Sequence, residues 1–448
     1  MNDITAIFAF LKCCLGYKGN MSRMIAGMNW HELYSFASKQ ALLGLCFEGI
    51  ERLGKEYPEE LKQNPIGREL LMTWMGKAQQ IRRQNMKVNA VAGKLFSMLR
   101  EDGMRCCVLK GQGNALMYPN PYSRTPGDID VWVNASRERI MEYASKKFEL
   151  GDDIRLQHLE TSLDGVPVEL HFFPCSMNNP IYHARLQKCF KRNADLQCSN
   201  VVKLPDGAGD IAIPTMAFNV IYQLTHLYHH FFDEGIGMRQ IIDYYYVVCD
   251  FYKVYQKSSN PSVSLSKGSS TFSPSPSSSG SGDVTAPSRC SEPLRSKDGG
   301  ASKPSPNCAG WDRLTIEGDN SAGSATAVTS SASTALVVVQ RELKYLGLWK
   351  FAGAVMYVLH EALGLPEEKM IAPMDEKRGK LLLAEILEGG NFGRHFTKYG
   401  GFTHQSMGKK YFLKIWRNMH FVRYYPAEAL SEPIFRTWHF FWRMKNKK

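Results

Sequence analysis

The middle of the chain contains the segment Arg124-Thr-Pro-Gly-Asp-Ile-Asp-Val-Trp-Val133. From Asp128 onward, apolar residues alternate with Asp128, Asp130 and Trp132, which predicts a strand with both carboxylates on one face. Two carboxylates that lie so close together suit Mg²⁺, which binds one or two carboxylates together with substrate phosphates. The alternative is that both aspartates cap a turn or a helix and hold no metal.

The residues on either side predict a small sheet with helices over 100–205. Residues 104–109 are short and β-prone, and two further β-prone runs at 155–163 and 166–173 are joined by Asp164-Gly165. An Asp-Gly pair between two such runs is a strong hairpin signal. Helices are expected at 112–118 and 137–148, so this part of the chain is an α+β unit.

A third carboxylate, Glu169, lies in Val166-Pro-Val-Glu-Leu-His-Phe-Phe173. A carboxylate in the middle of an apolar strand is costly to bury without a positive partner, and a metal ion would supply one. The alternative partner is a basic side chain such as Arg124 or Arg155. His171 follows Glu169 by two residues and should share its face.

Lys110-Gly111 follows the first strand and precedes the helix expected at 112–118. The free N–H groups at the start of a helix can bind phosphate. Gly111 and Gly113 would let a phosphate approach the backbone closely. These residues are therefore candidate nucleotide ligands.

Helices are expected on both sides of the α+β unit, over 1–99, 206–256 and 334–448. Residues 257–333 are rich in Ser, Gly and Pro and poor in large apolar residues. Such a composition cannot bury enough surface to offset the entropy of ordering, which predicts a disordered insertion. The expected organisation is a helical N-terminal region, a central sheet domain and a helical C-terminal domain interrupted by the insertion.

Three segments together resemble an uncharacterised bacterial nucleotidyltransferase family of the DNA-polymerase-β-like superfamily. They are Val108-Leu-Lys-Gly-Gln-Gly-Asn-Ala-Leu-Met-Tyr118, Arg124–Val133 and Val168-Glu-Leu-His171. The helical segment Gly235-Ile-Gly-Met-Arg-Gln-Ile-Ile-Asp243 is also similar to one in that family. The resemblance extends over about 20–440, without the Ser-rich insertion.

The resemblance implies metal-dependent transfer of a nucleoside monophosphate, with AMP the expected group, from an NTP to an acceptor hydroxyl on a small molecule or a protein. Asp128, Asp130 and Glu169 would be the catalytic residues and would hold Mg²⁺ or Mn²⁺. The resemblance also implies a set of nucleotide ligands, namely Lys110, Gly111, Gly113, Arg124 and Gly127.

The chain departs from the superfamily pattern at two positions. Gln112 stands where a Ser is usual, so a hydroxyl contact to phosphate is missing. Glu169 replaces the commoner Asp, which changes the reach of this carboxylate by one methylene.

Three further residues are candidate accessory groups. His158 could orient the site or simply pair across the sheet, and His171 is a candidate because it shares the face of Glu169. Arg239 could contact the nucleotide, but its i,i+4 spacing to Asp243 favours an intrahelical ion pair. A histidine cluster with helical spacing consists of His226, His229 and His230. It could form a metal-binding face, but no acidic partner lies at ligand spacing within that helix, so packing and hydrogen bonding in the helical domain are expected.

The composition of the 448 residues, 44% apolar and 22% charged, is normal for a soluble globular protein. The chain has 11 cysteines, an odd number, and no Cys-x-x-Cys, which argues against both a disulfide framework and a zinc site. Its N-terminal apolar run lacks a basic region and a cleavage site, and no run approaches the roughly 20 apolar residues of a membrane span. The cysteine pattern and the lack of a signal peptide or membrane span in the sequence predict a cytoplasmic location.

The formal charge of +12 is concentrated in the tail, where residues 394–448 contain 12 Lys or Arg and 2 Asp or Glu. Basic residues interleaved with aromatic residues could bind a single-stranded nucleic acid, but they suit an amphipathic helix packed on the rest of the protein equally well.

Two alternatives to the nucleotidyltransferase remain. A glycosyltransferase with an Asp-x-Asp motif would need a parallel βαβ unit before the motif, and the helical first 98 residues speak against it. A catalytically degenerate binding module with a basic helical tail is the second alternative. The sequence leaves the acceptor unassigned.

Overall fold

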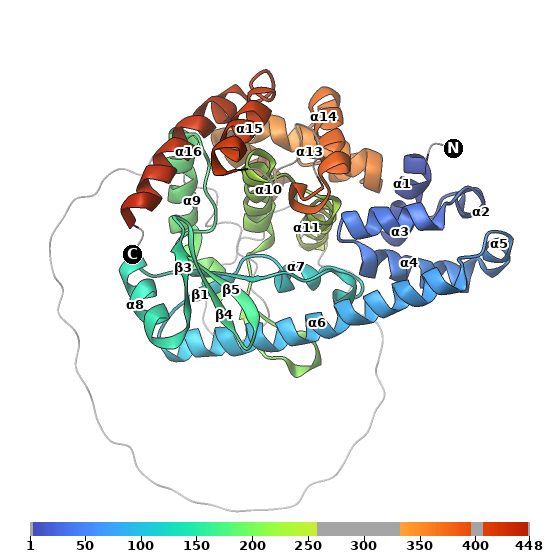
Figure 1. Ribbon diagram of the computed structural model, residues 1–448, viewed down its shortest axis with the longest axis horizontal. Helices are drawn as coiled ribbons and strands as arrows, with labels where there is room; N and C mark the ends of the chain where they lie inside the picture. Colours follow the sequence, from blue (N-terminus) through green and yellow to red (C-terminus); the bar gives the residue numbers. More distant parts are fainter. Residues whose placement is uncertain (1–2, 258–331, 396–405, 447–448) are drawn as a thin grey trace, which may run out of the picture.

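The computed structural model describes residues 3–257, 332–395 and 406–446 (Figure 1). A small mixed sheet lies in the middle of the chain and helical segments precede and follow it, which confirms the predicted α+β class. The disordered insertion predicted for 257–333 lies, apart from its terminal residues, outside the described residues.

Six helices precede the sheet, and the last of them is much the longest. They are α1 (Asp3–Cys14), α2 (Met21–Ala26), α3 (Trp30–Lys39), α4 (Leu43–Glu56), α5 (Pro58–Gln63) and α6 (Arg68–Glu101). Near the start of α6 the buried Trp74 donates a hydrogen bond from its indole N–H to the carbonyl of Leu43 at 2.8 Å. Towards its end α6 packs under the sheet through Val88, Leu95 and other apolar residues (Figure 1).

The central sheet has five strands in the order β1-β2-β5-β4-β3. Their bounds are β1 (Cys106–Val108), β2 (Ile129–Val133), β3 (Leu150–Ile154), β4 (His158–Leu163) and β5 (Val166–His171). β2 and β5 are parallel, whereas the pairs β1–β2, β3–β4 and β4–β5 are antiparallel. The helices within this unit are α7 (Gln112–Ala115) and α8 (Arg137–Lys147).

The predicted hairpin is confirmed, with Leu163 of β4 opposite Val166 of β5. Asp164 and Gly165 form its turn with φ of 50° and 70°. Two consecutive positive φ values are what a type I′ turn requires, and they explain why an Asp-Gly pair is found here. The hairpin fixes the register that carries Glu169 to its place on β5.

The two faces of the sheet are buried against different helices. Ile129 and Val131 of β2 face the apolar cluster that includes α6 and α8. On the other face Trp132 lies 6.2 Å, between ring centroids, from both Phe190 and Phe218. The face that carries Trp132 is therefore covered by helices from the second half of the chain, and Asp130 belongs to this face.

The second half of the described chain is mostly helical, with one short hairpin that was not expected. The elements are α9 (Pro180–Ser199), β6 (Val201–Lys203), β7 (Asp210–Ala212), α10 (Met216–Asp233), α11 (Met238–Lys257), α12 (Ala332–Tyr345), α13 (Trp349–Leu363), α14 (Glu376–Gly389), α15 (Met407–Met419) and α16 (Pro426–Asn446). Figure 1 shows α9 and α10 above the sheet, with α15 and α16 beyond them. No helix in the described ranges is long and apolar enough to cross a membrane.

Several basic residues of the tail are engaged inside the protein. Lys414 of α15 and Arg436 of α16 both contact Asp233 at the end of α10, each at 3.0 Å. Arg417, almost fully buried, lies 3.4 Å from Glu385 of α14. These contacts fit the packed amphipathic helix better than a continuous basic surface for nucleic acid.

Candidate active site

The parallel pairing of β2 with β5 brings the three predicted carboxylates together. Asp130 and Glu169 are register partners on these strands, and Asp128 lies directly before β2. One carboxylate oxygen from each of the three residues falls within a group whose members all lie within 4.8 Å of one another. Asp130 is 2% exposed, whereas Asp128 is exposed. The cluster is therefore buried at Asp130 and open to solvent at Asp128.

Two basic side chains contact the buried carboxylate of Asp130. Its Oδ1 lies 3.2 Å from Nζ of Lys110 and 3.0 Å from Nε2 of His171. Its Oδ2 is buried and has no hydrogen-bond partner among the described residues. A buried, unpaired carboxylate oxygen is costly, and a cation at this position would satisfy it.

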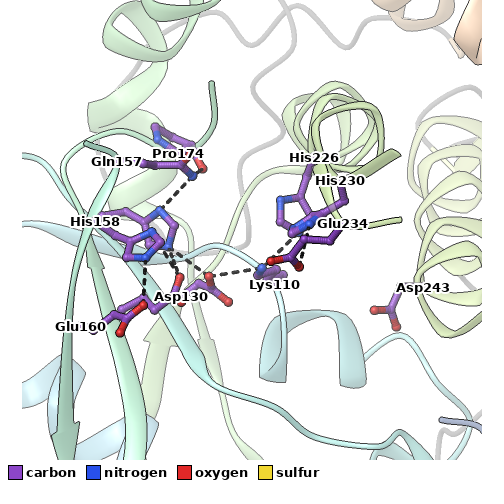
Figure 2. Close-up of polar contacts among 12 residues, drawn as sticks. Lys110, Asp130, Gln157, His158, Glu160, Pro174, His226, His230, Glu234 and Asp243 are labelled. Carbon is purple, nitrogen blue, oxygen red and sulfur yellow. Dashed lines mark hydrogen bonds and ion pairs between the residues drawn. The ribbon is translucent and has the colours of Figure 1, made fainter. Parts of the chain in front are cut away.

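Lys110 reaches from the loop after β1 to α10. Its Nζ donates to Nε2 of His226 at 3.0 Å, so the ammonium group is held between the sheet and α10 (Figure 2). Burial lowers the pKa of Lys110, but the charges of Asp130, Asp128 and Glu169 outweigh burial and raise it. Burial and the nearby charge of Lys110 hold the pKa of His226 well below its usual value. The pair is therefore a cation supported by a neutral imidazole.

Glu169 is paired with histidines and not with an arginine. Its Oε2 lies 3.2 Å from Nε2 of His171 and 3.4 Å from Nδ1 of His158. Burial raises the pKa of Glu169, but the hydrogen bond and charge of His171 and the charge of His158 outweigh burial and lower the pKa to about 2. Burial lowers the pKa of His171, but its bonds to Asp130 and Glu169 raise it to about 9.

Neither arginine considered as a partner of Glu169 takes that role. Arg155 lies 2.7 Å from Glu160 on β4. Arg124 donates from Nε and Nη2 to the two carboxylate oxygens of Asp243, each at 2.8 Å, and Asp243 also accepts from the hydroxyl of Tyr118 at 2.7 Å. This bidentate pair is almost fully buried and ties the loop before Asp128 to α11.

The pair also replaces the intrahelical ion pair favoured for Arg239 and Asp243. Asp243 is held by Arg124 and Tyr118, whereas Nη1 of Arg239 donates to the carbonyl of Thr125 at 3.1 Å. The guanidinium of Arg239 also lies over the ring of Phe392, 5.4 Å from its centroid. The i,i+4 spacing was a weak guide because a tertiary partner offered two matched hydrogen bonds.

The two glycines after β1 have different structural roles. Gly111 has a φ of 61° and a ψ of −107°, which is strained for a residue with a side chain. Gly113 is buried, and a Cβ there would lie 2.9 Å from Cγ2 of Ile213, so this glycine permits close packing. Gln112 is buried and donates to Asn89 of α6, away from the carboxylates. The helix that follows, α7, has only four residues.

A pocket of about 440 Å³, a volume that includes space open to solvent, lies between this loop, the carboxylates and helices α10 and α11. Seven predicted residues line it: Lys110, Gly111, Arg124, Gly127, Asp128, Asp130 and Arg239. Glu169 and His171 adjoin it through their contacts with Asp130, whereas Gly113 does not line it.

The pocket also contains residues that the sequence analysis did not assign to the site. They are Gln223, His226, Leu227, Gln240, Asp243 and Phe392. The sequence did place His226 and Asp243 on helices, but the partners that give them a role at the site, Lys110 and Arg124, are more than 100 residues away in sequence. No spacing rule within one helix could have found them.

A comparison with protein families matches residues 26–254 to a family described as uncharacterised nucleotidyltransferases. The match is shorter than the region of about 20–440 over which the resemblance was expected, and it includes α3 through most of α11. No curated protein and no solved structure matches the chain. Because the match covers more than half of the chain and includes the carboxylate cluster, the protein belongs to this nucleotidyltransferase family.

Proposed function

We propose that the protein transfers a nucleoside monophosphate, with AMP from ATP the expected group, to an acceptor hydroxyl on a small molecule or a protein. The observation that carries the proposal is the parallel register of Asp130 with Glu169, beside Asp128, in a family of nucleotidyltransferases. A glycosyltransferase is not favoured, because β2–β5 is the only parallel pair in the described sheet and helices precede it.

The carboxylate cluster fits divalent metal ions. It offers hard oxygen ligands from three side chains within 4.8 Å of one another, and the buried Oδ2 of Asp130 has no partner in the described part of the chain. Asp128, Asp130 and Glu169 would hold Mg²⁺ or Mn²⁺, which would stabilise charge on the attacking and leaving oxygens. The lowered pKa of Glu169 keeps its carboxylate ionised throughout the physiological range.

The triphosphate would lie in the pocket between the carboxylates and α11. Lys110 supplies a fixed cation there, and Arg239 is a second one whose Nε has no hydrogen-bond partner within the described residues. Gly111 and Gly127 leave the backbone accessible on the same side. Arg124 would act indirectly, by holding the loop before Asp128 against α11, because Asp243 already engages its guanidinium.

We also place the enzyme in the cytoplasm as part of this proposal. The cysteines within the described ranges are all free, and most of them are buried. Reduced thiols are typical of a reducing compartment.

The proposal is tested with ATP labelled at the α-phosphate, Mg²⁺ and a nucleotide-depleted bacterial extract separated into small molecules and macromolecules. Label should enter one fraction with the wild-type protein and not with Asp130→Asn. The matched control is Asp164→Asn, the same chemical change on the exposed turn of the β4–β5 hairpin, and it should behave as wild type. Equal labelling by Asp130→Asn, or labelling by no protein, would contradict the proposal.

A further inference from the structure

Two histidines lie side by side on the face of the sheet that carries the carboxylates. His158 of β4 and His171 of β5 are register partners, and their ring centroids are 5.0 Å apart. His158 lies beside Asp130, opposite His226 and His230 of α10 (Figure 2). The histidine pair thus forms the next row of the sheet after Asp130 and Glu169.

Both rings converge on one oxygen of Glu169. Nδ1 of His158 lies 3.4 Å and Nε2 of His171 lies 3.2 Å from Oε2 of Glu169. One ligand atom from each of the three residues falls within a group whose members all lie within 4.8 Å of one another. Two imidazole nitrogens and a carboxylate are therefore already gathered around one point.

His158 is buried without the partners that a buried imidazole needs. It is 8% exposed, and neither of its ring nitrogens makes a hydrogen bond with the described residues. The nearby carboxylate oxygens are Oε2 of Glu169, 3.4 Å from Nδ1, and Oε1 of Glu160, 3.8 Å from Nε2. A buried polar group in this condition calls for a specific explanation, such as an ion.

We propose that His158, His171 and Glu169 form a binding site for a first-row transition-metal ion, with Zn²⁺ as its representative. Mg²⁺ is bound by oxygen atoms, whereas imidazole ligands suit Zn²⁺ and its neighbours. Two histidines and one glutamate also match a common ligand set of zinc sites that keep an open coordination position. The site is distinct in ligand type from the oxygen cluster of Asp128 and Asp130, and it shares Glu169 with that cluster.

The surroundings support the ligands and give access to the ion. The amide N–H groups of Gln157 donate to Nδ1 of His171 at 3.3 Å and to the carbonyl of Pro174 at 3.0 Å. The ring is thereby held with Nε2 towards the carboxylates, and a metal ion bound there would displace the proton of Nε2. His158 also lines a second pocket, about 710 Å³ including open space, which Arg155, Asp233 and Arg436 border. An ion at His158 would be reached from this second pocket.

The test is a titration of the untagged, chelator-treated full chain with Zn²⁺ by calorimetry. The wild-type protein should bind one Zn²⁺ at this site, and His158→Ala should weaken binding by at least about tenfold, since even outer-shell changes cost 10–100-fold. The matched control is His31→Ala, which removes an exposed histidine from α3 and should leave the affinity unchanged. Circular dichroism of each variant checks that the fold is kept.

Co²⁺ provides a second readout on the wild-type protein itself, because the visible spectrum of bound Co²⁺ reports nitrogen ligands directly. Zn²⁺ should bleach this spectrum by competition, and Asp128→Asn should retain it. Two results would overturn the site: no Zn²⁺ binding by the wild type, or binding that Asp128→Asn loses and His158→Ala keeps. Failure of nucleotide binding or transfer would leave these results untouched, so the two proposals fail independently.

Discussion

The buried pair of Arg124 and Asp243 yields the sharpest quantitative prediction. The side chains are only 4% and 6% exposed and share two hydrogen bonds of 2.8 Å. Asp243→Asn keeps the shape and one acceptor for Tyr118, but it leaves the guanidinium charge without its counterion. Removing one partner of a buried ion pair typically costs about 3–5 kcal/mol, because the remaining charge stays desolvated. We expect a loss of this size.

Urea unfolding followed by circular dichroism measures the loss. Asp164→Asn is the matched control, because its pair with Lys94 is about half exposed and such pairs contribute about 0–1 kcal/mol. Replacing both members, as in Arg124→Met with Asp243→Leu, should recover much of the stability, since no buried charge then remains. The argument is refuted if Asp243→Asn is no more destabilising than Asp164→Asn.

Three further predictions concern single residues. Lys110→Met should weaken Mg²⁺-dependent ATP binding about 10–100-fold by removing a charge-assisted contact, as measured by calorimetry, and a change below threefold would argue against a phosphate contact. Trp132→Ala should cost about 3–5 kcal/mol in urea unfolding, because the indole is 4% exposed and packs against two aromatic rings; a loss under 1 kcal/mol would contradict this packing. Burial raises the pKa of Asp233, but Lys414 and Arg436 outweigh burial and lower it far below the usual 3.8. Its stabilisation is therefore present above about pH 4 and lost as the pH falls further, so urea midpoints of the wild type should drop more steeply in acid than those of Asp233→Asn, and parallel curves would refute this.

Local signals in the sequence predicted the parts of the site that lie on single elements. The alternation around Asp128 and Asp130 predicted β2, and Asp164-Gly165 predicted the β4–β5 hairpin. Both signals arise from short-range geometry, namely the two-residue period of a strand and the positive φ values of a tight turn. Glu169 was expected nearby, but only the parallel register of β5 with β2 makes it the neighbour of Asp130.

Contacts between distant elements were beyond such signals. Arg124 was expected to contact the nucleotide, and its ion pair with Asp243 depends on how α11 packs against the loop. The strand β3 was missed because Leu150-Gly-Asp-Asp-Ile154 lacks apolar alternation, and β6 and β7 were missed because three residues carry no period. The ring nitrogens of His158 are buried and make no hydrogen bond with the described residues. The position of His158 on its strand does not reveal this burial.

The central claim is that Asp128 and Asp130 hold the metal ions that bind a nucleoside triphosphate. Calorimetric titration of each NTP with and without Mg²⁺, on the wild type and on Asp128→Asn/Asp130→Asn, tests it most directly. The account predicts binding of one NTP, with ATP expected, that requires Mg²⁺ and is lost in the double variant. Binding of no NTP by the folded wild-type protein, or binding that the double variant retains, would contradict it.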